Sequence, residues 1–252
     1  MAKSSNRQDS NRQDPLSSRS RSPKSGQSSS QPSTPRPSKL KTSKLGTSKL
    51  RHSDRKTPKR KRPEDNPDSE ILSRPQLLVA MAATALILLL IARIWMFFEP
   101  FQFPTTLNGR DAGFGVVIGL CISTVSILVY RLWPAYRQSA DYYLDFVLSP
   151  LILSDSIWIG LLPGMSEELL FRGVMLPAIG LNATGLLVSS ACFGVLHMSS
   201  QQQWPYAVWA SAIGLVLGGS ALATGNLLVP IVAHITTNFV SSLFWLRAQQ
   251  SS

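Results

Sequence analysis

Three groups of ionisable or strongly polar side chains interrupt the apolar second half of this 252-residue sequence. Charged side chains inside apolar helices cost several kcal/mol each and mark functional sites when they occur. A carboxyl group acting as a base, together with imidazole and amide hydrogen-bond donors, provides the components of general acid–base chemistry. In chain order the three groups are Glu167 and Glu168 with Arg172, then His197, then His234 with Asn238.

The two adjacent glutamates are expected to have different roles if this segment is helical. Glu168 and Arg172 are four residues apart and can pair on one helix face. Glu167 is rotated by about 100° from Glu168. Desolvation of an unpaired carboxyl group is the usual way in which a glutamate becomes a base near neutral pH, so Glu167 is the candidate base.

Each group also has a purely structural explanation. Both acids could satisfy the nearby arginine and cap a helix that begins after Pro163-Gly164, with Ser166 as its N-cap. A single histidine in an apolar helix, such as His197, is more often a packed core residue than a catalyst. An asparagine such as Asn238 commonly makes hydrogen bonds between helices. For each group taken alone, these alternatives stay open.

The way these groups occur together favours a shared function. Phe193 and His197 lie one helical turn apart, and so do His234 and Asn238, so each pair can share a face. After Asp155, every acid and every histidine of the chain belongs to one of the three groups. If each of these residues had an unrelated structural role, acids and histidines would be expected elsewhere in this apolar half as well.

Charge and hydropathy divide the chain into a basic tail and an apolar body. Residues 1–75 hold 19 of the 25 lysines and arginines and 7 of the 14 acids, whereas residues 76–252 hold 6 basic and 7 acidic residues. The mean hydropathy of +0.08 is therefore an average over two unlike parts. The tail is rich in Ser, Pro and Gln, has little apolar surface to bury, and is predicted to be disordered.

The body is predicted to be an all-α polytopic membrane protein, with about six hydrophobic helical segments bundled around an intramembrane polar cavity. A bilayer core needs about 20 helical residues, and several apolar runs have that length. Residues 76–149 should hold two transmembrane helices and a loop, and residues 150–247 the helical catalytic core. The predicted segments are 77–98, 113–133, 146–180 (interrupted at Pro163-Gly164), 184–197, 206–223 and 228–246.

Six basic residues between Lys56 and Arg74 precede the first membrane helix and place the amino terminus on the cytoplasmic or equivalent side. Attraction of the tail to anionic lipid explains this basic run more simply than a nucleic-acid or protein partner, so nucleic acid is not an expected partner. The other expected partners are the bilayer itself and a membrane-associated peptide. Cys121 and Cys192 have no metal-type spacing and are expected to be buried thiols.

The motifs EELLFRG, FGVLH and HITTN resemble, in order, the EExxxR, FxxxH and HxxxN motifs of a known family. This is the type II CAAX prenyl endopeptidase and bacteriocin-processing (CPBP or Abi) family of intramembrane proteases. The resemblance implies a glutamic endopeptidase in which Glu167 and His197 activate water and His234 and Asn238 stabilise the oxyanion. It further implies that Glu168 and Arg172 hold the motif together and that Phe193 supports the site.

Two other functions remain open. Glu167, His197 and His234 match the ligand set of some zinc hydrolases, although the sequence has no HExxH motif. The resemblance implies no cofactor. A scaffold, chaperone or transporter that retains the fold could also use these residues, for example as a proton relay.

The depth of the three groups in the membrane raises a difficulty. If every segment crosses as a straight helix, His234 lies near the outer end of the last helix, while Glu167 and His197 lie toward the inner side. Two arrangements would bring them together. Either the helices tilt around a deep cavity, or residues 206–223, which contain Gly218-Gly219, are re-entrant.

Overall fold

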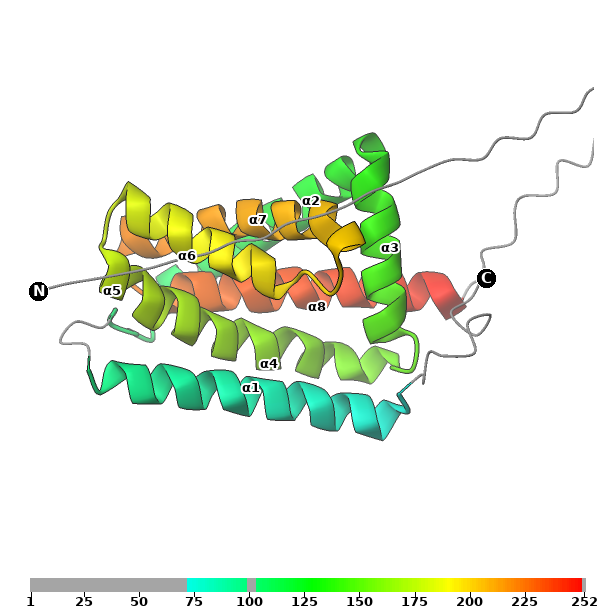
Figure 1. The fold of residues 1–252 in the computed structure, drawn as a ribbon, viewed down its shortest axis with the longest axis horizontal. Helices are drawn as coiled ribbons and strands as arrows, with labels where there is room; N and C mark the ends of the chain where they lie inside the picture. The colour runs from blue at the N-terminus through cyan, green and yellow to red at the C-terminus, as the bar shows by residue number, and fades with distance from the viewer. Residues whose placement is uncertain (1–71, 99–102, 251–252) are drawn as a thin grey trace, which may run out of the picture. The chain divides into compact units, whose positions relative to one another are not determined.

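The structure, a computed structural model, describes residues 72–98 and 103–250 (Figure 1). The predicted disorder of the tail and its attraction to anionic lipid therefore fall almost entirely outside the described residues. Within the described ranges every regular element is a helix and there is no β-strand. The all-α class predicted from the sequence is confirmed.

Four helices of the described ranges are long and apolar enough to cross a membrane. They are α1 (Arg74–Met96), α2 (Gly109–Leu132), α7 (Trp204–Thr224) and α8 (Leu228–Gln250). A fifth span is formed if α3 and the helices after it are counted together. The remaining elements are α3 (Pro134–Leu148), η2 (Leu153–Asp155), α4 (Ser156–Glu168), the π-helix η3 (Leu169–Met175), α5 (Leu176–Ile179), α6 (Ala183–Leu196) and η4 (Gln201–Gln203).

The outer faces of these helices are apolar. On α1, for example, Val79, Leu86 and Leu90 are exposed, while a narrow stripe that includes Ala85 and Leu88 is buried. Lipid hydrocarbon is the solvent that suits such a surface, and the chain is an integral membrane protein. The expectation that both cysteines are buried is wrong, because Cys121 and Cys192 lie on this exposed surface.

The predicted interruption at Pro163-Gly164 is wrong. Helix α4 continues through both residues, and Ser166 is not an N-cap, since its hydroxyl donates to the carbonyl of Leu162 at 2.8 Å. Proline is tolerated inside membrane helices when neighbouring groups compensate for the lost backbone bond. The real break precedes α4, where the chain bends by 101° after α3. Helix α3 itself was not predicted.

A second irregularity follows the glutamate pair directly. The π-helix η3 begins at Leu169, immediately after Glu168, and contains Arg172. A π-helix widens the turn and changes which side chains face a neighbouring helix, and such turns are frequent at functional sites. No feature of the sequence predicted this π-helix.

Helix α8 packs closely against α2 and α4 (Figure 1). A Cβ atom on Gly119 would lie 2.6 Å from the carbonyl oxygen of Ala233, and one on Gly164 would lie 2.6 Å from Cγ1 of Ile235. Small residues spaced four apart allow helix backbones to approach in this way. The glycines that make these contacts are Gly115 and Gly119 on α2 and Gly160 and Gly164 on α4.

Helix α7 is one continuous helix, so the re-entrant alternative for residues 206–223 does not describe the structure. Leu77 at the start of α1 and Leu246 near the end of α8 share one core cluster with Leu148 and Ile159. The start of α1 and the end of α8 therefore lie at the same end of the helix bundle (Figure 1). The side of the membrane that this end faces stays a prediction.

Replacing Gly119 by Leu should destabilise the protein by about 1–3 kcal/mol, because the new side chain forces α2 away from α8. Thermal unfolding of the protein in detergent measures this effect. The matched control is Gly113→Leu on the same helix, where an added Cβ meets nothing within 4 Å. Equal unfolding temperatures for the two variants would contradict the close packing described above.

Candidate active site

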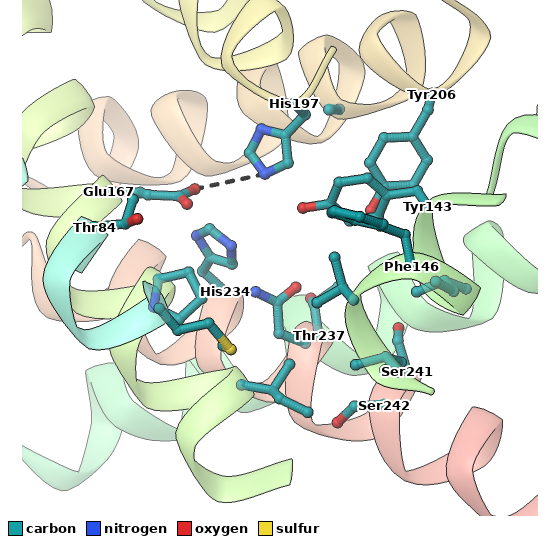
Figure 2. Close-up of a pocket in the computed structure, with 18 of the residues that line it drawn as sticks. Thr84, Tyr143, Phe146, Glu167, His197, Tyr206, His234, Thr237, Ser241 and Ser242 are labelled. Atoms are coloured by element: carbon teal, nitrogen blue, oxygen red, sulfur yellow. Dashed lines mark ion pairs between the residues drawn. The ribbon is translucent and has the colours of Figure 1, made fainter. Parts of the chain in front are cut away.

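A cavity of about 410 Å³ lies inside the helix bundle and gathers the predicted catalytic residues (Figure 2). Glu167, His197, His234 and Asn238 all line it. They come from α4, from the C-terminal end of α6 and from α8. Side chains from α1, α3 and α7 complete the wall.

Glu167 and His234 meet because α4 and α8 run in opposite directions, and each residue lies at a different distance from the start of its own helix. Glu167 lies about 21 Å along the helical segment that starts at Leu153, and His234 lies about 9 Å along α8 from the opposite end, at 1.5 Å per residue. In a hydrocarbon core of about 30 Å these two depths coincide. The sequence predicted different depths for Glu167 and His234 because it predicted a helix break at Pro163. In the structure the break comes before α4, and the two residues lie at the same depth.

Glu167 faces His197 across the cavity (Figure 2). Its Oε2 atom lies 3.6 Å from Nε2 of His197, which is longer than a direct hydrogen bond. The Glu167 side chain is buried, and Oε2 has no hydrogen-bond partner among the described residues. One carboxylate oxygen is therefore available to a group bound between the two side chains.

The orientation of the His197 ring is set by the end of α6. Its Nδ1 atom lies 2.8 Å from the carbonyl oxygen of Phe193. A carbonyl oxygen only accepts hydrogen bonds, so Nδ1 carries the proton and donates. In the neutral ring this leaves a lone pair on Nε2, the atom that faces Glu167.

Glu168 accepts two hydrogen bonds from different elements. Its Oε1 atom lies 2.7 Å from a terminal nitrogen of Arg172, as the spacing predicted, and 2.8 Å from Nδ1 of His234. The side chains of Glu168 and Arg172 are 0% exposed, and that of His234 is 4% exposed. The contact with His234 was not predicted, because it joins two helices that are distant in sequence. It directs the other ring nitrogen of His234 away from Glu168.

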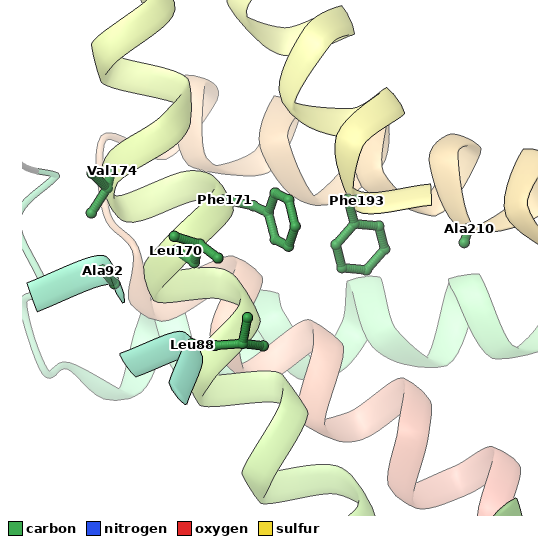
Figure 3. Packing of buried hydrophobic residues seen from close by; sticks show 7 residues of the cluster. All are labelled: Leu88, Ala92, Leu170, Phe171, Val174, Phe193 and Ala210. Carbon is green, nitrogen blue, oxygen red and sulfur yellow. The ribbon is translucent and has the colours of Figure 1, made fainter. Parts of the chain in front are cut away.

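The Phe193 ring contacts the charged and aromatic members of the site. The guanidinium of Arg172 lies 4.4 Å from its centroid, in cation–π geometry. The His197 and His234 rings lie 4.6 Å and 5.6 Å from it. Phe193 also packs into a core cluster with Phe171 and Leu88 (Figure 3). It thus ties both imidazoles to the apolar core.

Asn238 lies one turn after His234 on α8, is half-buried and lines the cavity. No group of three His, Cys, Asp or Glu side chains in residues 72–98 and 103–250 is placed to hold a metal ion. The zinc ligand set considered from the sequence, Glu167 with both histidines, is therefore not gathered as such a group. That the enzyme needs no metal stays a prediction.

Two tyrosines that the sequence did not single out also line the cavity. Tyr143 comes from α3 and Tyr206 from the first turn of α7, and their rings stack with centroids 4.5 Å apart. Pro134 at the first position of α3 was the available signal for this helix. Without the helix, nothing in the sequence placed Tyr143 near the glutamates.

Residues 149–240 match the protein family described as type II CAAX prenyl endopeptidase Rce1-like. The uncharacterized protein YpbD of Bacillus subtilis (strain 168) is 29% identical over 131 residues, which are 52% of this chain and 67% of that protein. No solved structure shows significant similarity to the chain. The match to the family begins after α3 and covers all three motifs. Residues 149–240, the part of the chain that carries the site, are therefore similar to the Rce1-like type II CAAX prenyl endopeptidases.

Proposed function

We propose that this protein is an intramembrane glutamic endopeptidase that hydrolyses a peptide bond of a membrane-associated protein or peptide. The observation that carries the proposal is the free Oε2 atom of Glu167, 3.6 Å from Nε2 of His197 in a cavity inside the helix bundle. The similarity of residues 149–240 to an endopeptidase family supports this class of reaction.

Water is activated between Glu167 and His197. A water molecule bound there donates one hydrogen bond to the carboxylate and one to the lone pair on Nε2, which orients its oxygen toward the substrate carbonyl. As the oxygen attacks the carbonyl carbon, Glu167 takes a proton from the water. When the C–N bond breaks, Glu167 returns this proton to the leaving nitrogen, so that the products are a carboxylic acid and an amine.

His234 and Asn238 stabilise the oxyanion of the tetrahedral intermediate. Glu168 accepts a hydrogen bond from Nδ1 of His234. In the proposed mechanism His234 acts as an imidazolium, whose Nε2–H donates to the oxyanion. When Glu167 becomes protonated, the negative charge moves to the oxyanion beside His234. Donors fixed in advance where charge develops lower the barrier, and they do so most strongly away from water.

Glu167→Gln should abolish cleavage, with a loss of at least about 10²-fold in kcat, because an amide cannot accept the proton of water. The measurement is mass spectrometry of membrane peptides cleaved by the purified protein. Cys192→Ala, a change of an exposed residue on α6, is the control and should retain activity. Retained cleavage by the Glu167 variant would refute the mechanism and favour a scaffold or transporter.

His234→Ala and Asn238→Ala should each lower kcat by about 10²- to 10³-fold with little change in KM, because each removes a donor used mainly in the transition state. Steady-state kinetics on one cleaved peptide separates the two constants. Phe244→Ala on the same helix, at a residue that is 62% exposed, is the matched control. A rise in KM alone would assign these residues to substrate binding.

The purified, active protein should contain no stoichiometric zinc, and chelators should leave its activity unchanged. The proposed mechanism gives the base and the oxyanion donors to side chains alone. Elemental analysis and assays with and without chelator test this expectation. Activity lost to chelators and restored by zinc would replace the glutamic mechanism with a metal-dependent one.

A further inference from the structure

Three tyrosine rings form a stack in the wall of the cavity. Tyr136 and Tyr206 are nearly parallel, with an interplanar angle of 10° and centroids 6.2 Å apart. Tyr206 and Tyr143 continue the stack at 4.5 Å and 26°. The base of the stack is fixed by Trp209, whose ring meets the edge of Tyr136 at 5.9 Å. A stack braced in this way presents its last ring, Tyr143, in a defined orientation.

Tyr143 lies in the wall of the cavity that holds the reacting groups. It lines the same cavity as Glu167, and Figure 2 shows its ring beside that of Tyr206. Tyr206 is the only ring of the described residues that stacks on Tyr143. The Tyr143 ring therefore borders the space that the proposed substrate occupies.

The distance from the reacting groups corresponds to a short stretch of substrate. The Tyr206 centroid lies 6.3 Å from that of His197, and an extended peptide advances about 3.5 Å per residue. A substrate whose scissile bond lies at His197 therefore places a side chain within about two residues of that bond against the tyrosines.

We propose that Tyr143 and Tyr206 form a substrate subsite that binds an aromatic side chain within about two residues of the scissile bond, with Tyr143 determining the selectivity. Aromatic rings gain from offset stacking beyond what their buried area provides, and among the described residues no second ring stacks on Tyr143. Tyr143 lies outside residues 149–240, so the subsite is built partly by a helix that the family match does not cover. The inference rests on the proposed peptidase function.

The first test compares peptides on the unchanged, full-length protein. It uses apolar decapeptides that carry Phe, cyclohexylalanine or Ala at each central position, with cut sites and kcat/KM read by mass spectrometry. Peptides with Phe near the cut should be cleaved about three- to tenfold faster than those with cyclohexylalanine, which has a similar size but no aromatic face. Equal rates would overturn the subsite.

The second test assigns the selectivity to Tyr143. Tyr143→Leu should lower the Phe-over-cyclohexylalanine ratio to about one, whereas Tyr143→Phe should keep it, because the ring is retained. Tyr142→Leu, a change at the neighbouring exposed residue, is the matched control. The ratio is internal to each variant, so a general loss of activity cancels. An unchanged ratio in Tyr143→Leu would contradict the assignment.

Failure of the subsite can be told apart from failure of the proposed function. If the wild-type protein cuts none of the peptides, the peptidase proposal fails for them, and binding of the same peptides is measured directly. Preferential binding of the Phe peptides by Glu167→Gln, lost in the double variant with Tyr143→Leu, would support the subsite without catalysis. Binding without preference would overturn it.

Discussion

The carboxylate of Glu168 joins the elements that carry the site. It lies at the end of α4, accepts from Arg172 in the π-helix and from His234 on α8, and Arg172 in turn donates to the carbonyl of Gly214 on α7 at 3.0 Å. An ionised group buried in apolar surroundings costs several kcal/mol unless its partners are in place, and removing one partner costs about 3–5 kcal/mol. These contacts thus penalise any packing of α4, α7 and α8 in which His234 is displaced.

Such a network forms only if the helix backbones can come close together. The lipid outside the bundle is as apolar as the helix side chains, so burial of apolar surface gives little drive for association. Close van der Waals contacts must therefore stabilise the helix association. The glycines of α2 and α4 make such contacts with α8 around Ala233 and Ile235, on either side of His234. The charged network therefore depends on the glycine contacts, because these contacts set the distance between the helices at which the network can form.

The parts of the site that could be predicted from the sequence are those set within one helix. The Glu168–Arg172 contact and the one-turn spacing of Phe193 and His197 follow from helical periodicity. The contact between Glu168 and His234 could not be predicted, because it depends on how α4 packs against α8. The break was misplaced at Pro163 because a local rule about proline was overridden by packing, and α3 was missed because its apolar residues form no continuous run.

The adjacent glutamates show why neighbours in sequence can do different chemistry. The Oε1 atom of Glu168 accepts from two donors, Arg172 and His234, so this carboxylate is engaged in holding the helices together. Glu167 is rotated by about 100° from Glu168 around α4 and lines the cavity, where its Oε2 atom has no hydrogen-bond partner among the described residues. The hydrogen bonds of Glu168 stabilise the fold, whereas the carboxylate of Glu167 stays free to react. Exchanging the two environments would require α4 to turn by about 100°, which the contacts of Gly164 with α8 prevent.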